Sequence, residues 1–377
     1  MISLLRQLAR KFSGKSSFDY PVIEQKKYLL KFREPRSLIE RSFFQYKAQM
    51  KLKGFWISLL LNTASIPLFF VYFLMPGNRL NECLTRDAVF VKDGGVNDNV
   101  LPDSLREEFV SLETKAVEGR KLNLKDRAYI VKMLLKHPLS WHFALKAEIK
   151  IARYRWLISL YSPKALIVHN EYSFTSSLLT DFCNRNGVEL INVMHGEKLF
   201  FMRDSFFQFN RCYVWDEFYK ELFTEMRADS QQFIVEAPPS LKFKKNDVIK
   251  TVDFTYYLQA QNGQNLRYII DILIALRDKG NKVAIRPHPR YTDIIQLNDY
   301  TEGSNIEIEK FKELSIEDSV LRTKNVISIY STVLLQAYCN GVSVVMDNLS
   351  NQSLYDKLKE TKYMMLQFDN KLLSDFI

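Results

Sequence analysis

Short apolar runs alternate with longer segments of helical periodicity along most of the chain. The runs are rich in Val, Ile, Phe and Tyr and are bounded by Gly, Pro, Asn or Asp, which is typical of buried β-strands. Between them, apolar residues recur every three or four positions, as in helices that pack on a sheet. The alternation predicts an α/β protein with parallel sheets. We expect strands at 88–91, 165–168, 188–193, 211–215, 254–258, 282–285, 305–308, 325–329 and 342–346.

A proline-rich segment divides this pattern into two halves. Ala237-Pro238-Pro239-Ser240 is followed by the charged run KFKKND, and a new strand pattern starts at Val252. A length of 377 residues is enough for two hydrophobic cores. We therefore expect one Rossmann-like domain at 81–240 and a second at 248–377. The helices expected in the first domain are 103–118, 125–137, 141–161 and 173–186, the last ended by Gly187.

Residues 1–80 are predicted to form a basic, partly apolar helical arm. Residues 1–54 hold 13 Lys or Arg against 4 Asp or Glu, and the remainder of the chain is nearly neutral. The basic charge therefore belongs to the arm, and no nucleic-acid-binding face is expected on the body. The amphipathic segment 2–12 fits either an anionic membrane surface or ordinary packing on the body. Arg6 interrupts its apolar run, so no signal peptide is expected.

The most apolar window, residues 55–75, has the length of a membrane span. Asn62, Thr63, Ser65 and Pro67 cluster near its middle, which favours a buried or interface-dipping hairpin of helices over a span. The cysteines are scattered without a CxxC spacing, so we expect reduced core thiols in a cytoplasmic protein. They are Cys83, Cys183, Cys212 and Cys339.

One strand of the second domain ends in a turn with three basic side chains. Pro287 and Pro289 stop the strand, because proline has no N–H for a sheet and fixes its own φ. Arg286, His288 and Arg290 occupy the same turn. In open α/β sheets, ligands lie beyond the carboxyl ends of the strands. The sequence therefore predicts an anion-binding site here.

A second anion-binding feature follows the strand expected at 325–329. Tyr330-Ser331-Thr332 stands where this strand gives way to a helix. The first N–H groups of a helix lack partners and attract phosphate, and two hydroxyls add further donors. Taken alone, Ser331 is better explained as an ordinary N-cap. Its pairing with the basic turn in one domain favours a nucleotide-phosphate site.

The basic turn and the Ser331-Thr332 helix start together resemble the HP and S-S/T motifs of bacterial sialyltransferases and related CMP-sugar transferases with the GT-B fold. The resemblance includes Gln259-Ala260-Gln261 and covers the chain from about residue 85 to 347. It implies two Rossmann-like domains that face a cleft. Where these families often carry a glutamate on the following helix, this chain has Gln336.

The resemblance also implies roles for single residues. His288 would contact the phosphate or ribose of the cytidine nucleotide. Ser331 and Thr332 would bind the phosphate, with Arg290 or Arg286 nearby. The full set expected at the nucleotide is His288, Arg290, Arg286, Ser331, Thr332, Tyr330, Gln259 and Gln336.

Three expected strands of the first domain end on ionisable side chains, Glu171, His195 and Asp216. An inverting transferase needs a general base for the acceptor hydroxyl, and a retaining enzyme with a double displacement needs a carboxylate nucleophile. Glu171 and Asp216 are the best carboxylate candidates, and His195 is the alternative base. Each of them taken alone fits a cap, a turn or a buried ion pair equally well. Their position on neighbouring strand ends favours a shared site.

The segments IVHNEYS, NVMHGE and YVWDEFY look like proteins of capsule and lipopolysaccharide synthesis, including transferases of the eight-carbon acid Kdo. The acidic D/E-D/E-G motif of sialyltransferases is poorly matched by Asp93-Gly94-Gly95. This departure favours Kdo over a sialic-acid-like sugar. Asp216 is then the candidate nucleophile of a retaining reaction.

The sequence thus predicts a GT-B glycosyltransferase that moves an acidic sugar from its CMP donor to a lipid-linked surface glycan. No DxD triplet is evident, so neither a metal nor a cofactor is expected, and a CMP leaving group has a single phosphate to neutralise. The arm would hold the enzyme on the cytoplasmic face of the inner membrane. Two alternatives remain: a CDP-glycerol or ribitol-type polyol-phosphate transferase, and a non-catalytic membrane-associated assembly protein with a degenerate transferase fold.

Overall fold

The computed structural model describes residues 17–79, 83–92, 98–244 and 248–377. Two features discussed from the sequence, the amphipathic segment at 2–12 and Asp93-Gly94-Gly95, lie outside these residues.

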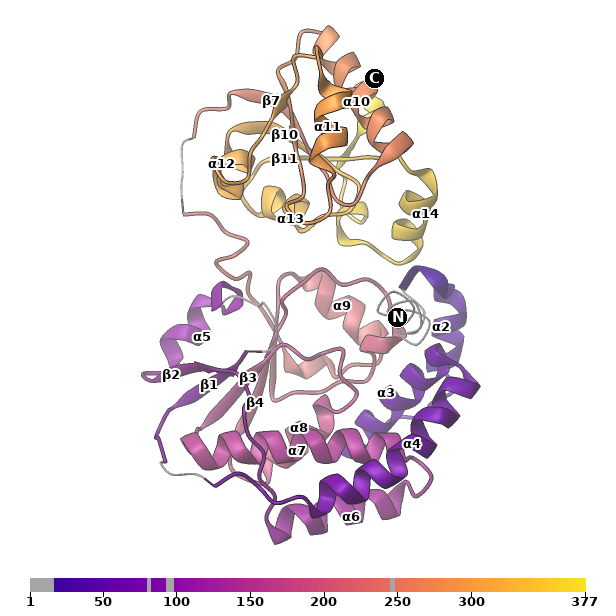
Figure 1. The fold of residues 1–377 in the computed structure, drawn as a ribbon, viewed down its shortest axis with the longest axis vertical. Helices are drawn as coiled ribbons and strands as arrows, with labels where there is room; N and C mark the ends of the chain where they lie inside the picture. Colours follow the sequence, from indigo (N-terminus) through magenta and orange to yellow (C-terminus); the bar gives the residue numbers. More distant parts are fainter. Residues whose placement is uncertain (1–16, 80–82, 93–97, 245–247) are drawn as a thin grey trace. The chain divides into compact units, whose positions relative to one another are not determined.

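The chain divides into two compact units. Unit 1 comprises the chain up to His195 together with Phe200–Pro238, and unit 2 comprises Gly196–Leu199 and Pro239–Ile377. Each unit contains one six-stranded sheet in which all described pairs of strands are parallel (Figure 1). The α/β class and the two Rossmann-like sheets of the predicted GT-B fold are therefore confirmed.

The sheet of unit 1 has the strand order β2-β1-β3-β4-β5-β6. Its core holds fully buried side chains such as Phe90, Ile167 and Ile191. The four strands expected here from the sequence are all present. The strands are β1 (Ala88–Val91), β2 (Leu112–Lys115), β3 (Ala165–Val168), β4 (Glu189–Val193), β5 (Arg211–Val214) and β6 (Phe233–Val235).

The helix expected at 103–118 is wrong in its second half. Helix α5 ends at Glu108, and strand β2 follows and pairs with β1, Leu112 beside Ala88. Ahead of both strands, Asp87 and Ser111 exchange hydrogen bonds. Pairing with an open sheet edge outweighs the local helical periodicity, because β propensity depends on tertiary context.

Helices α6 and α7 match the sequence expectation closely. In Figure 1, α7 runs between the sheet and the pair formed by α4 and α6. Helix α3 packs against α8 on the same unit. The helices of unit 1 are α2 (Val22–Leu29), α3 (Leu38–Lys53), α4 (Phe55–Leu74), α5 (Asp103–Glu108), α6 (Leu124–Lys136), α7 (Trp141–Tyr161), α8 (Ser176–Asn184) and α9 (Glu217–Glu225).

Helix α4 is one continuous helix, which corrects the expected hairpin. Its polar residues do not break it, because they bond to carbonyls one turn earlier. Asn62 donates to Ser58 at 2.9 Å, and the Ser65 hydroxyl donates to Leu61 at 2.7 Å. Pro67 is accommodated inside the helix. Among the described residues, α4 alone has the length and apolar composition to cross a membrane.

The sheet of unit 2 has the order β12-β11-β10-β7-β8-β9, and its core includes Ile270, Ile285 and Ile327. The short edge strand β12 was not expected. The strands are β7 (Val252–Tyr257), β8 (Val283–Arg286), β9 (Glu307–Ile308), β10 (Thr323–Ser328), β11 (Ser343–Met346) and β12 (Lys371–Leu372). The helices are α10 (Gly263–Asp278), α11 (Ile294–Thr301), α12 (Ile316–Leu321), α13 (Thr332–Cys339) and α14 (Gln352–Glu360).

All four cysteines are free, but they are not all in the core. Cys183 and Cys212 are buried and Cys339 is half-buried, whereas Cys83 is exposed. The expectation of a core thiol is therefore wrong for Cys83, because this residue lies in an irregular segment before β1 and not in a strand.

Candidate functional site

A cavity of about 360 Å³ opens at the carboxyl end of the unit 2 sheet. From β7 the chain proceeds outward to β8 and then returns to β10 on the other side of β7. This is the topological switch point at which open α/β sheets bind ligands. The basic turn after β8 and the Ser331-Thr332 start of α13 both line this cavity. The two strands before them are separated by β7, yet the two motifs meet in one space.

His288 is held in a defined tautomer inside this turn. Its Nδ1 accepts the backbone N–H of Arg290 at 3.1 Å, so the proton of the neutral ring is on Nε2. Its ring stacks on Tyr291 with 4.5 Å between centroids. Burial, and then the charge of Arg290, lowers the pKa of His288 below its ordinary 6.5. The ring is therefore a neutral Nε2–H donor at neutral pH.

The two arginines of the turn differ in their surroundings. The Arg286 guanidinium is buried and donates to Glu309 at 3.0 Å and to the Leu314 carbonyl at 2.9 Å. It is therefore held in a buried ion pair that fixes the end of β8, and Arg286 is also one of the residues that line the cavity. Arg290 is exposed and is not among the residues that line the cavity.

Ser331 is the N-cap of α13. Its hydroxyl oxygen accepts the Val333 N–H at 3.2 Å, which confirms the capping interpretation. Thr332 is exposed at the first helical position and lines the cavity. Because α13 begins here, the positive end of its dipole lies at the cavity wall. The cap takes up the Val333 N–H, and the Leu334 N–H donates to the Ser331 carbonyl at 3.1 Å, so the Ser331 and Thr332 hydroxyl protons are the donors that capping leaves for an anion.

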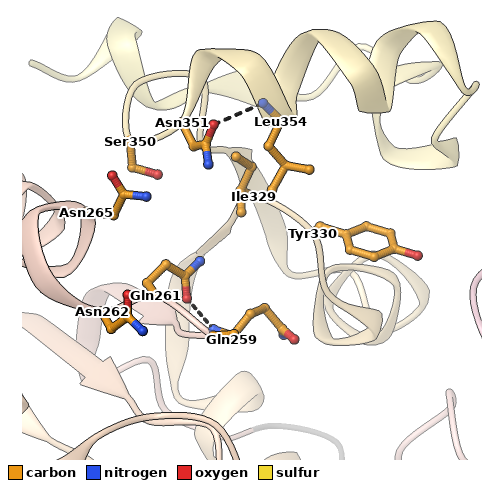
Figure 2. A pocket seen from close by; sticks show the side chains of 10 residues that line it. Gln259, Gln261, Asn262, Asn265, Ile329, Tyr330, Ser350, Asn351 and Leu354 are labelled. Atoms are coloured by element: carbon orange, nitrogen blue, oxygen red, sulfur yellow. Dashed lines mark hydrogen bonds between the residues drawn. The ribbon is translucent and has the colours of Figure 1, made fainter. Parts of the chain in front are cut away.

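A second cavity of about 220 Å³ lies beside the first, and half of the residues that line it carry carboxamide side chains (Figure 2). Gln259 lines both cavities, and its backbone N–H donates to the Gln261 side chain at 2.5 Å. Asn351 caps α14 through Leu354 at 3.0 Å. Tyr330 lines this second cavity, and its ring packs edge-on against Tyr363. The lining residues carry no charged side chain. Their amide groups are neutral hydrogen-bond donors and acceptors, which suit the hydroxyl groups of a ligand.

Gln336 does not line either cavity. Its side-chain amide donates to the Ser240 carbonyl at 2.9 Å, in the segment that opens unit 2. Asn340 on the same helix donates to Leu241 at 2.7 Å. The two amides therefore fasten this segment to α13, and we leave Gln336 out of the nucleotide contacts proposed below.

In unit 1, two of the three candidate catalytic residues are close together. Strands β3, β4 and β5 are neighbours, as expected, so their polar ends share one rim. Glu171 is 1% exposed and accepts from Asn192 at 3.2 Å. Its other oxygen is 3.8 Å from Nδ1 of His195, whose side chain is 24% exposed. The His195 ring lies 4.6 Å from that of His169. His195 is thus the accessible member of a buried cluster.

Sequence reasoning missed several members of this cluster. The Asn192 side chain donates to Glu171 and accepts the backbone N–H of Asn170. In the sequence, the only indication of this role is a polar amide among the apolar residues of β4. Burial lowers the pKa of Arg203, but the charges of Asp204 and Glu171 outweigh it and raise the pKa above the ordinary value. Nothing in the local sequence of Arg203 indicates that it lies near Glu171.

Helix α3 holds the cluster in place. The Gln45 side chain donates to the backbone carbonyls of Glu171 and Arg203, each at 3.0 Å. Gln49 donates in the same way to Tyr172 at 2.8 Å. Part of the predicted basic arm therefore supports the candidate catalytic loops, a role that the charge pattern did not reveal.

Asp216 has a separate structural task. It is the N-cap of α9 and accepts the Phe218 N–H at 2.9 Å. Elsewhere on unit 1, the His137 ring stacks on Phe43, and the His142 ring contacts the Ser65 hydroxyl. Across the described residues, no group of three or more His, Cys, Asp or Glu side chains is placed to hold a metal ion.

Comparisons with known proteins give structural neighbours at low sequence identity. No protein-family model and no curated protein matches the sequence. S. aureus MnaA in a co-structure with UDP is similar at 13% identity and a TM-score of 0.44, covering 73% of this chain and 87% of that one. The UDP-N-acetylglucosamine 2-epimerase from Rickettsia bellii is similar at 11% and 0.42, covering 78% and 92%. The lipopolysaccharide outer core galactosyltransferase WaaB in its apo form is similar at 11% and 0.41, covering 69% and 80%.

Proposed function

We propose that this protein is a glycosyltransferase that moves an acidic 2-keto-3-deoxy sugar from its CMP donor to a bacterial surface glycan. Kdo is favoured as the sugar, ahead of a sialic-acid-like nonulosonate. The observation that carries the proposal is the cavity at the switch point of unit 2. There the basic turn after β8 and the hydroxyl-bearing start of α13 line one space.

The chemistry of this cavity suits a nucleotide with a single phosphate. The Nε2–H of His288 and the hydroxyls of Ser331 and Thr332 supply donors for the phosphate oxygens, and the positive end of the α13 dipole favours a negative charge. Phe311 and Pro287 are apolar members of the cavity lining, on which a flat base would pack. The neighbouring carboxamide cavity offers hydrogen bonds for the sugar hydroxyls. Arg286 acts indirectly, because its ion pair with Glu309 fixes the turn.

Unit 1 supplies the group that accepts the proton. In an inverting reaction, His195 takes the proton of the acceptor hydroxyl, and Glu171 stabilises the imidazolium that forms. The acceptor oxygen then bonds to the anomeric carbon. The bond from that carbon to the phosphate oxygen breaks, and CMP leaves with the electron pair. A retaining reaction would require a carboxylate nucleophile instead, for which Asp216 is the candidate.

We further propose that the acceptor is a lipid-linked oligosaccharide at the cytoplasmic face of the inner membrane. A growing glycan on a lipid carrier stays at the bilayer surface, and the basic N-terminal residues favour an anionic surface of that kind. The donor and acceptor would then meet on a protein bound peripherally to the membrane. Neither a metal nor a cofactor takes part in the proposed reaction.

Nucleotide binding tests the donor site directly. Thermal unfolding is followed with CMP, CDP and UDP, the last because it is the nucleotide named with a similar structure. At a hundredfold excess over Kd, CMP should stabilise unit 2 by about 2.7 kcal/mol. His288→Ala and Thr332→Val should remove most of this effect. Thr224→Val, the same change at an exposed position on α9, is the matched control.

Three outcomes of this titration have distinct meanings. Tighter binding of UDP than of CMP would overturn the CMP donor and leave a transferase standing. Binding of no nucleotide would favour the non-catalytic assembly protein. If CMP binds, release of CMP from CMP-Kdo, CMP-sialic acid or CDP-glycerol separates the two acidic sugars from the polyol-phosphate alternative.

A further inference from the structure

The outer faces of α4 and α6 carry a large exposed apolar surface. Between residues 55 and 75, ten large apolar side chains are exposed, including Trp56 at 77% and Leu74 at 74%. Four more follow on and after α6, among them Leu124 at 84% and Leu135 at 74%. On α6 itself, exposed apolar side chains recur at helical spacing and form one stripe. The members of the stripe are Leu124, Ala128, Val131 and Leu135.

The opposite side of α4 packs against α7. Phe69 is buried and packs edge-on against Trp141 of α7. The Asn62 side-chain oxygen accepts the backbone N–H of His142 at 3.1 Å, and the Ser65 hydroxyl lies 3.2 Å from Nδ1 of the His142 ring. A helix that left α7 to cross a bilayer would lose these partners for its polar side chains. The geometry therefore keeps α4 lying along α7.

Helix α6 continues the same surface at the far end of α4. Arg127 on α6 donates to the Phe73 carbonyl and lies over the Phe73 ring, 4.9 Å from its centroid. Both helices pack on α7, which separates them from the sheet (Figure 1). The apolar faces of α4 and α6 are thus parts of one helical layer on the outside of unit 1.

The charges around this layer are almost all positive. Residues 43–75 and 121–150 contain ten Lys or Arg and only two carboxylates. Both carboxylates are buried: Asp126 pairs with Arg155 at 2.7 Å, and Glu148 is fully inside. The layer therefore presents an apolar surface with a cationic rim and, among these residues, no exposed carboxylate.

This charge distribution distinguishes between two possible occupants. A second copy of the chain in a two-fold symmetric contact would bring the same lysines together with no carboxylate to pair them. An anionic bilayer offers acyl chains to the apolar side chains and phosphates to the lysines. We propose that α4 and α6 form an in-plane membrane-binding surface, with α4 lying in the headgroup region and Lys125, Lys132 and Lys136 contacting anionic lipid. The proposal does not depend on the transferase activity.

Flotation with lipid vesicles tests this surface on the full chain. Vesicles of phosphatidylethanolamine and phosphatidylglycerol should carry the protein upward in a density gradient. Leu60→Glu with Leu135→Glu should weaken binding at least about tenfold, because each change places a charge among acyl chains. Val110→Glu, an equivalent change at a 97% exposed site elsewhere on unit 1, should bind normally. Both variants retain residues 1–54 unchanged.

A second variant tests the cationic rim. Lys132→Glu with Lys136→Glu should reduce binding to phosphatidylglycerol vesicles and should also reduce the effect of salt on binding. Circular dichroism confirms that each variant is folded. Normal flotation of the Leu60→Glu, Leu135→Glu variant would overturn the proposal. A stable dimer in light scattering that this variant converts to monomers, without lipid binding, would assign the surface to a second copy instead.

Discussion

Glu148 on α7 provides a quantitative test of how the helical layer of unit 1 is built. Its side chain is fully buried, and neither carboxylate oxygen has a hydrogen-bond partner among the described residues. Burial raises its pKa from 4.5 to about 8, against the opposing charges of Arg120 and Arg127. Arg120 is itself engaged by α4, because it donates to the Tyr72 carbonyl at 2.6 Å and lies 3.7 Å from the Tyr72 ring centroid.

The raised pKa makes the stability of unit 1 depend on pH. The folded state binds one more proton than the unfolded state between the two pKa values. The contribution of Glu148 is therefore fully present below pH 4.5 and is lost as the pH rises through about 8. At about 1.36 kcal/mol for each pKa unit, the loss is roughly 4–5 kcal/mol as an upper bound. Glu148→Met removes this loss and retains the volume.

Urea unfolding from pH 4.5 to 8.5 measures this effect. All four tryptophans belong to unit 1, so their fluorescence follows this unit alone: Trp56, Trp141, Trp156 and Trp215. The Met variant and the natural chain should be similar at pH 4.5, and the variant should be more stable by several kcal/mol at pH 8.5, on the order of the pKa difference. Glu118→Met, at a largely exposed carboxylate, should change little. Parallel pH curves for Glu148→Met and the natural chain would refute the reasoning.

Three further predictions concern the candidate sites. Asp216→Asn should preserve the α9 cap, because Asn caps a helix as well as Asp does. Asp216→Ala should lower the free energy of unfolding of unit 1 by about 1 kcal/mol in urea. Full turnover by the Asn variant would exclude Asp216 as a nucleophile. Gln45→Ala should lower kcat and destabilise unit 1 by about 1–3 kcal/mol, because the Glu171 carbonyl loses its hydrogen-bond donor. The Kd for CMP should stay constant, and weaker CMP binding would contradict the assignment of CMP to unit 2. Glu309→Gln should destabilise unit 2 by about 3–5 kcal/mol, because the buried Arg286 charge loses its partner. Unfolding followed by circular dichroism measures this change in stability. A change below about 1 kcal/mol would show that water replaces the carboxylate.

Much of the fold follows from local patterns in the sequence. Interior strands such as β3 and β8 are short apolar runs between turn residues, and buried strands leave this pattern wherever they lie. Helix α7 is an uninterrupted periodic segment, and its predicted bounds agree with the structure. The strands that the sequence did not predict, β2, β6 and β12, are all edge strands. Their formation depends on a free neighbouring strand, which no local window contains.

The candidate sites show the same division. The sequence placed His288 and Ser331 in the second domain and Glu171 and His195 at strand ends, because residues that follow strands in an α/β sheet collect at one rim. It also showed that the basic charge is concentrated in residues 1–54. These results depend only on order along the chain and on the periodicity of apolar positions.

Only the tertiary structure shows which of these side chains already have a partner within the protein. Arg286 is paired with Glu309, and Gln336 fastens the segment that opens unit 2, although both looked like ligand contacts in the sequence. Apolar residues of α4 remain exposed, since α7 covers only one side of the helix. Partners that are distant in sequence determine whether a charge or an apolar face is satisfied inside the protein, and such pairings exist only once the chain has folded.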